Sequence, residues 1–202
     1  ISIANEKGGV AKTTTTISLG GALAESGARV LLIDMDAQAN LSLALGFEPG
    51  KVANTIVSNF LENRPLSALW QATSVENLSV LPSNSEMGLV ERMLPNRPSY
   101  EETLRRALQA EPIPFDYILI DCPPFLGAVT FNALTASNLL IMPTQAEYFS
   151  IYALRNMMSL IRRVRAKNNP RLTYRLLLTM FDRRNRIHRT MNEQLHTTFE
   201  SG

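Results

Sequence analysis

Short apolar runs alternate along this chain with longer stretches that mix apolar and polar residues. Five runs are rich in isoleucine and leucine, and each stops close to a polar residue or a proline: 1–4, 29–33, 117–120, 139–142 and 174–180. Strands this uniformly apolar are typical of a parallel sheet that is covered by helices on both faces. The runs therefore predict the strands of such a sheet.

Helix-compatible stretches lie between the runs. Residues 13–26 are rich in threonine, leucine and alanine, and Gly27 ends them. Between residues 154 and 164 apolar side chains recur at helical spacing, and arginines lie off that stripe, which predicts an amphipathic helix with a basic outer side. Residues 48–100 contain five prolines, so helices there should be short and broken by loops.

This alternation predicts an α/β fold: a doubly wound, mostly parallel sheet with helices on both faces. In such folds a ligand lies at the C-terminal ends of the strands. No repeat or linker divides the chain, so we expect a single domain over residues 1–202. Because the chain opens inside a strand without Met and stops without a closing element, we expect this domain to be truncated at both ends.

Charge is distributed unevenly along the sequence. Residues 1–154 carry nine basic and fifteen acidic side chains, whereas residues 155–202 carry eleven basic and three acidic ones. The C-terminal third is therefore expected to face a polyanion or an acidic partner. Cys122 is the single cysteine, which excludes a disulfide framework, and no apolar run approaches the roughly 20 residues that span a bilayer. We expect a cytoplasmic protein with no membrane contact.

A glycine-containing loop stands between the first predicted strand and the first predicted helix. It consists of Lys7, Gly8, Gly9, Val10, Ala11, Lys12, Thr13 and Thr14. Glycines let the backbone curl so that N–H groups point at a phosphate, and the helix N-terminus adds positive charge. Lys12 would hold the β and γ phosphates, and the Thr13 hydroxyl would bind Mg²⁺. The plain alternative is a glycine turn between a strand and a helix.

The loop departs from the pattern G-x-x-x-x-G-K-[ST], because Glu6 and Ala11 replace its glycines. What remains, K-G-G-x-x-K-[ST], resembles the deviant Walker A motif, whose additional lysine would be Lys7. The segment LLIDMDAQANLSLALG after it is similar to switch I of the ParA family, with Asp36, Gln38 and Asn40 on its D-x-D-x-Q-x-N pattern. Ala37 and Ala39 stand where proline and glycine are more usual.

A second acidic strand end, Asp121-Cys122-Pro123-Pro124, resembles the D-x-P-P Walker B signature of the same family. The resemblance covers nearly the whole chain and implies a ParA/Soj-type P-loop ATPase. It implies Lys7, Lys12 and Asp36 as catalytic residues, and Thr13, Asp36 and Asp121 as the Mg²⁺ site. Asp34 would shape the strand end, and Met180 and Asp182 would lie near the ATP base.

The resemblance also implies a mechanism. Two ATP-bound subunits would form a homodimer in which Lys7 of each reaches the phosphates of the other. No arginine finger is placed by motif, so hydrolysis should be slow and stimulated by a partner, either a centromere-binding protein or an adaptor. The cargo would be a plasmid, a chromosome or a protein compartment.

The ATP dimer would bind DNA without sequence preference and associate with the nucleoid. Candidate DNA-binding residues are Arg162, Arg163, Arg165 and Lys167 on one helix, and Arg183, Arg184, Arg186 and Arg189 in the next. The plain alternative is a solvated surface. Rival functions are a MinD-like membrane-associated ATPase, an ATP-binding scaffold with little hydrolysis, and an iron–sulfur ATPase, which a single cysteine disfavours.

Overall fold

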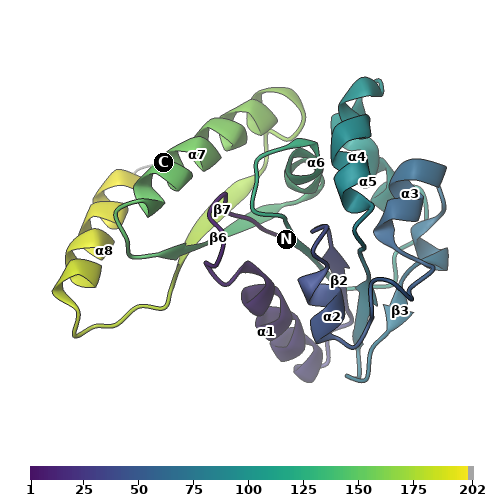
Figure 1. Cartoon of the computed structure of the whole chain (residues 1–202), viewed down its shortest axis with the longest axis horizontal. Coiled ribbons are helices and arrows are strands. Elements are labelled where there is room, and N and C mark those ends of the chain that lie inside the picture. The colour runs from purple at the N-terminus through teal and green to yellow at the C-terminus, as the bar shows by residue number, and fades with distance from the viewer. Residues whose placement is uncertain (200–202) are drawn as a thin grey trace.

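The computed structural model describes residues 1–199 and contains one seven-stranded sheet in the order β3-β4-β2-β5-β1-β6-β7. The strands are β1 (Ser2–Ile3), β2 (Val30–Asp34), β3 (Gln71–Ala72), β4 (Leu78–Leu81), β5 (Tyr117–Asp121), β6 (Leu139–Gln145) and β7 (Thr173–Thr179). The helices are α1 (Lys12–Glu25), α2 (Asn40–Ala44), α3 (Ile56–Glu62), α4 (Met87–Met93), α5 (Thr103–Gln109), α6 (Ala128–Ala136), α7 (Ser150–Lys167) and α8 (Arg186–Phe199). Only β3 pairs in the antiparallel sense, so the predicted mostly parallel sheet is confirmed (Figure 1).

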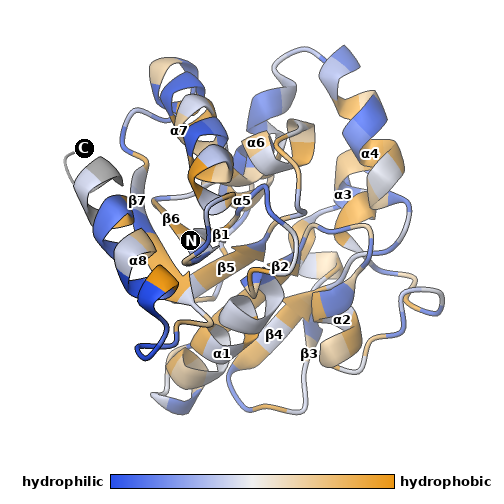
Figure 2. Cartoon of the chain, turned by 60° about the vertical axis from the view of Figure 1, so that its left-hand side comes forward, coloured by the Kyte–Doolittle hydropathy of each residue, from blue (hydrophilic) through white to orange (hydrophobic). Residues whose placement is uncertain are grey.

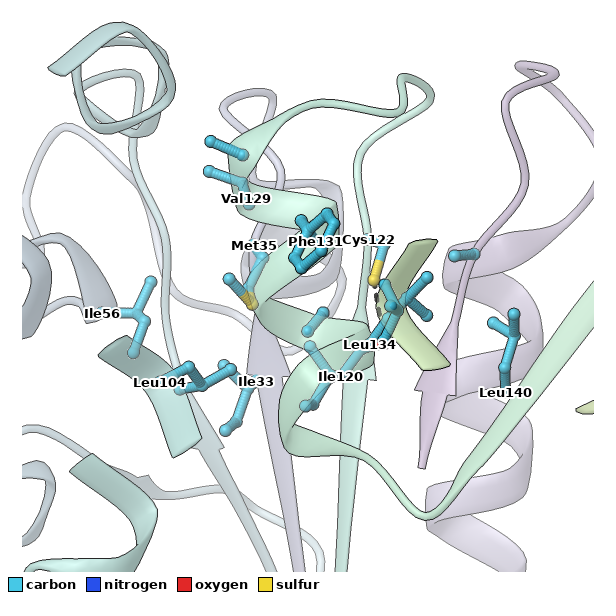
Figure 3. Packing of buried hydrophobic residues seen from close by; sticks show 14 of the residues in the cluster. Ile33, Met35, Ile56, Leu104, Ile120, Cys122, Val129, Phe131, Leu134 and Leu140 are labelled. Carbon is cyan, nitrogen blue, oxygen red and sulfur yellow. Dashed lines mark hydrogen bonds between the residues drawn. The ribbon is translucent and has the colours of Figure 1, made fainter. Parts of the chain in front are cut away.

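Both faces of the sheet are covered, because successive strand residues point to opposite sides. Val30 and Leu32 of β2 belong to a cluster shared with α1, whereas Leu31 and Ile33 belong to a larger cluster shared with α3 to α7. In Figure 3, Ile33 and Ile120 of the sheet lie close to residues of α6 in this larger core. The doubly wound arrangement is therefore present, and within residues 1–199 no helix is long and apolar enough to cross a membrane.

The strand predicted to stop at Pro143 instead continues to Gln145. The prediction was wrong because it treated proline as a strand terminator. In β6 the carbonyl of Ile141 accepts a hydrogen bond from the Ala4 N–H, so the backbone of Ile141 faces β1. The backbone of residue 143, two positions further on, faces the same side. Strand β1 has ended there, and the missing N–H of Pro143 costs no ladder hydrogen bond.

Two strands in the proline-containing region were not predicted. Strand β4 pairs parallel with β2, and β3 adds an antiparallel edge of two residues. Both are too short for their alternation to be distinguished from loop sequence. By contrast, the amphipathic α7 is confirmed: Leu154, Met157, Ile161 and Val164 are buried, while Figure 2 shows hydrophilic residues on its outer side.

A carboxylate caps the N-terminus of helix α6. The two oxygens of Glu91 accept the backbone N–H groups of Ala128 and Val129, at 2.7 and 2.9 Å. These N–H groups have no partner within their own helix, and a negative charge is favourable beside them. Glu91 therefore fixes α6 and, with it, the loop that follows Asp121.

Gly127→Ala should destabilise this junction, because a Cβ at residue 127 would overlap with the Glu91 carboxylate. We expect the free energy of unfolding to fall by about 1–2 kcal/mol, the usual cost of losing a helix cap. Urea unfolding monitored by circular dichroism measures it. The matched control is Gly21→Ala in α1, where a Cβ meets nothing within 4 Å and helix propensity should give a gain of about 0.5–1 kcal/mol. Equal midpoints for Gly127→Ala and the native protein would contradict the capping role.

Candidate nucleotide site

The loop after β1 is held at its start by a buried amide side chain. Asn5 is 1% exposed; its Oδ1 accepts the Lys7 N–H at 3.0 Å, and its Nδ2 donates to the Pro143 carbonyl at 2.7 Å. The loop is thereby anchored to β6. Sequence analysis missed Asn5, although a polar residue directly after an apolar strand was the available signal.

The loop itself leaves its amide groups available. Within residues 1–199, the N–H groups of Gly8, Gly9, Val10 and Ala11 donate no hydrogen bond to backbone or side chains. Gly8 and Gly9 are exposed, and Gly9 has a φ of 73° that favours glycine. These donors stand directly before the N-terminus of α1, where a phosphate is also attracted by the helix dipole. The predicted loop residues are therefore arranged as a phosphate cradle.

Lys12 lies at the first turn of α1 and points back into the loop. Its Nζ donates to the Lys7 carbonyl at 3.0 Å, and the residue is only 8% exposed. Burial lowers the pKa of Lys12, while the carboxylate of Asp121 opposes that shift. An ammonium group held inside the loop by a carbonyl is placed to exchange that contact for a phosphate.

Thr13 and Asp121 meet directly. The Thr13 hydroxyl donates to Asp121 Oδ2 at 2.7 Å, and the Thr16 hydroxyl lies 3.4 Å from Oδ1. Asp121 is 2% exposed, and burial raises its pKa to about 7. This pair fits Mg²⁺, which prefers oxygen ligands and keeps much of its water. Within the described residues, no three His, Cys, Asp or Glu side chains form a metal-holding group, so few protein ligands would contribute.

The acidic residue that ends β2 and the one two positions after it have different surroundings. Asp34 is fully buried and its Oδ2 accepts both the N–H and the hydroxyl of Ser42, at 2.9 and 2.7 Å. Burial raises the pKa of Asp34 to about 6. Asp36 is half-buried, and its Oδ1 accepts the Gln38 N–H at 3.0 Å. Asp34 thus holds α2 against the end of β2. Asp36 is the more accessible of the two carboxylates.

The additional lysine of the loop contacts residues at the end of β6. Lys7 Nζ donates to Gln145 Oε1 at 3.0 Å and forms an ion pair with Glu147. Gln145 ends β6 and Glu147 follows it, and the sequence offered no role for either. Glu147 directly precedes Tyr148 and Phe149, which are 63% and 72% exposed.

The end of β7 lies against the loop. The Thr179 hydroxyl donates to the Val10 carbonyl at 3.1 Å, and Gln145 Nε2 contacts Gly9 O and Met180 Sδ, at 3.3 and 2.9 Å. Met180 is therefore next to the loop. Asp182 lies further along: its carboxylate binds Arg184, which lowers the pKa of Asp182.

The candidate DNA-binding residues separate into two sets. The predicted placement on α7 is confirmed for Arg162, Arg163, Arg165 and Lys167. The prediction that Arg183 and Arg184 lie in the next helix was wrong, because a turn at 183–184 precedes α8, which begins at Arg186. Four of the eight already contact other groups: Lys167 pairs with Glu101, Arg184 with Asp182, and Arg165 and Arg163 stack over Tyr174 and Phe131. Among the described ion pairs none involves Arg162, Arg183, Arg186 or Arg189.

Two alanines at positions where the resemblance favours glycine have left-handed backbones. Ala11 has a φ of 68° and Ala39 a φ of 51°. Such conformations cost an L-residue about 1–2 kcal/mol. Ala11→Gly and Ala39→Gly should each raise the free energy of unfolding by about 0.5–1 kcal/mol, since part of the gain is lost to the greater entropy of unfolded glycine. Chemical denaturation measures this free energy of unfolding. The control is Ala22→Gly in the middle of α1, which should lower the free energy of unfolding by about 1 kcal/mol.

The raised pKa values of Asp121 and Asp34 predict a pH dependence of stability without Mg²⁺ or nucleotide. The folded chain binds protons at these groups more tightly than the unfolded chain, whose Asp pKa is near 3.9. The free energy of unfolding should therefore fall, by on the order of 1–4 kcal/mol, as pH rises from about 4 to about 7, and then level off. Urea titrations in EDTA at several pH values measure this slope. Asp121→Asn should flatten it, and an unchanged slope in that variant would contradict the assignment.

Comparison with known proteins agrees with this site. A family model described as an AAA domain matches residues 1–174. The sporulation initiation inhibitor protein Soj of Bacillus subtilis (strain 168) is 40% identical over 200 residues, covering 98% of this chain and 79% of Soj. The chromosome partitioning protein ParA of Myxococcus xanthus (strain DK1622) is 39% identical over 201 residues, covering 99% of this chain and 71% of that ParA.

The fold and cofactors agree as well. A solved structure of cobyrinic acid a,c-diamide synthase from Mycobacterium smegmatis, with bound ADP and magnesium, has a TM-score of 0.93 and 37% identity, and the match covers 98% of this chain and 81% of that one. The loop amides, Lys12 and the Thr13–Asp121 pair are groups of the kinds that bind phosphates and Mg²⁺. The chain accordingly belongs to the ParA/Soj-type family of partition ATPases, with ATP and Mg²⁺ as its cofactors.

Proposed function

We propose that this chain is an ATP-dependent dimerising switch that binds DNA without sequence preference and partitions or positions cargo. The observation that carries the proposal is the position of Lys7. Its ammonium lies on the outer rim of the loop, held by Gln145 and Glu147, while Lys12 occupies the interior. A lysine so placed can exchange its surface partners for the phosphates of a second subunit.

The surface around Lys7 supports a dimer contact. Tyr148, Phe149 and Tyr152 are 63%, 72% and 53% exposed, and their rings contact one another edge to face. Exposed aromatic side chains are enriched at protein interfaces because they bury large areas at low entropic cost. In the proposed dimer these rings face the partner, so association would bury them and bring Lys7 to the opposite nucleotide.

Hydrolysis in this proposal depends on positioning and charge. Lys12 and the loop amides bind the phosphates, and Asp36, the accessible carboxylate beside the site, orients the attacking water. Mg²⁺, held by Thr13 and, through water, by Asp121 or Asp36, would neutralise charge on the phosphates. Within residues 1–199 no arginine hydrogen-bonds to the loop, which supports slow turnover accelerated by an adaptor or centromere-binding protein.

DNA binding is proposed from the basic C-terminal third. Arg162 on α7, Arg183 before α8, and Arg186 and Arg189 in α8 are exposed and enter none of the described ion pairs, so they carry the strongest expectation of phosphate contact. Arg163, Arg165, Lys167 and Arg184 would first have to leave their present partners. Such a surface would place the ATP form on the nucleoid, and the cargo would be a plasmid, a chromosome or a protein compartment.

The test is binding to a random-sequence duplex with ATP, ADP or no nucleotide, across a salt series. Only ATP should support binding, and Lys7→Ala and Lys12→Ala should abolish it. The combined Arg162→Ala, Arg186→Ala and Arg189→Ala variant should lower the salt slope by up to about three, since each phosphate contact contributes roughly one. Lys51→Ala, which removes an exposed lysine paired with Glu48, is the control and should change nothing.

Two outcomes would overturn parts of this proposal. If ATP drives dimerisation but DNA is ignored at low salt, the basic third serves another partner, and a membrane-associated function becomes the better account. If DNA binding survives Lys7→Ala with ATP present, the dimer is not the DNA-binding form. Single-turnover hydrolysis on the same samples separates a slow ATPase from a scaffold that binds ATP without cleaving it.

A further inference from the structure

A cavity of about 590 Å³ lies between α3 and α5, apart from the nucleotide site. Its lining residues are Asn59, Asn63, Arg64, Pro65, Leu66, Arg97, Pro98, Thr103, Arg106, Ala107, Ala110 and Glu111. None of them belongs to the phosphate loop or to the strand ends that surround it. Figure 1 shows α3 at one end of the molecule and the basic helix α8 at the other.

Three guanidinium groups line this cavity, and no lysine does. Within residues 1–199, neither Arg64, Arg97 nor Arg106 forms an ion pair. Arg97 donates one N–H to the Phe60 carbonyl, and Arg106 donates one to the Ser99 carbonyl at 2.8 Å. Each guanidinium has five donors, so most of them remain for a ligand. Their fork geometry matches carboxylate and phosphate groups.

The single acidic residue of the lining does not neutralise these charges. Glu111 accepts the N–H of Ser67 at 2.9 Å and also its hydroxyl. These hydrogen bonds lower the pKa of Glu111, so it stays ionised. One carboxylate against three guanidinium groups leaves the lining with a net positive charge of two, a balance that favours a doubly charged anion.

A buried amide holds one wall of the cavity. Asn59 lines the cavity and is 7% exposed. Its Nδ2 donates to the Arg64 carbonyl at 2.8 Å, which ties the backbone at Arg64 to α3.

We propose that this cavity binds a small organic anion with two acidic groups, phosphate or carboxylate. The acidic groups would contact Arg64, Arg97 and Arg106, and the carbon skeleton would pack on the exposed prolines of the lining, Pro65 and Pro98. The volume falls within the range of about 300–1,000 Å³ found for small-molecule sites. This second ligand site is separate from ATP and does not depend on the proposed DNA switch.

Calorimetric titration with 3-phosphoglycerate tests the proposal, because this probe carries both a phosphate and a carboxylate. ADP and excess Mg²⁺ are present throughout, so that the phosphate loop is already filled. Malate and glycerol 3-phosphate are titrated in parallel: tighter binding of malate would identify carboxylates as the preferred groups, and tighter binding of glycerol 3-phosphate would identify phosphate. Saturable one-to-one binding of at least one probe at millimolar concentration is expected.

Arg64→Gln and Arg106→Gln should each weaken that binding about tenfold, the usual effect of losing one charge-assisted contact. Arg64 donates no side-chain hydrogen bond within residues 1–199, so its variant should fold normally, and thermal unfolding checks this. Arg171→Gln, an exposed arginine outside the lining, is the matched control and should bind like the native chain. Absence of saturable binding by all three probes, or equal weakening in Arg171→Gln, would overturn the proposal.

Discussion

The hydrogen bond from the Thr13 hydroxyl to the buried carboxylate of Asp121 joins the phosphate loop to the centre of the sheet. Asp121 ends β5, lies beside Asp34 in register, and gives its carbonyl to the Met35 N–H at 3.0 Å. Helix α1, β5 and β2 therefore meet at one residue. Burying a carboxylate is costly unless it is hydrogen-bonded, so the position of Thr13 is closely constrained. The loop, Lys12 and the accessible Asp36 all take their places from this junction.

Local backbone strain accompanies this junction. Ala11 caps α1 and Ala39 caps α2, and both adopt left-handed conformations that alanine ordinarily avoids. Ala11 ends the glycine-containing loop, and Ala39 ends the loop that follows β2. Strain of this kind persists where surrounding contacts over-determine the backbone, and it is common at functional sites. Here the contacts are identifiable: Asp34 holds the start of α2 through Ser42, and Asn5 holds the start of the phosphate loop.

Charged side chains fall into three groups with different surroundings. The buried carboxylates Asp34 and Asp121 end β2 and β5, and the buried Lys12 begins α1. Arginines on α7 and around α8 form an exposed basic surface, part of which is already paired. Arginines around the α3–α5 cavity have no acidic partner other than the ionised Glu111 in their lining. Net charge alone, at +2, conceals all three arrangements.

The doubly wound sheet, the glycine-containing loop and the acidic strand ends were predictable from the sequence, because uniformly apolar strands, a glycine-rich turn and a carboxylate at a strand end are each local patterns. It could not reveal that β6 passes through Pro143, since that depends on the last β1–β6 pair lying two positions earlier, at Ile141. The tertiary structure alone decided that Lys7 rests on Gln145 and Glu147, that Glu91 caps α6, and that three arginines share a cavity. Each of these joins residues distant in the chain, and such contacts are set by how the elements pack and not by the pattern within any one of them.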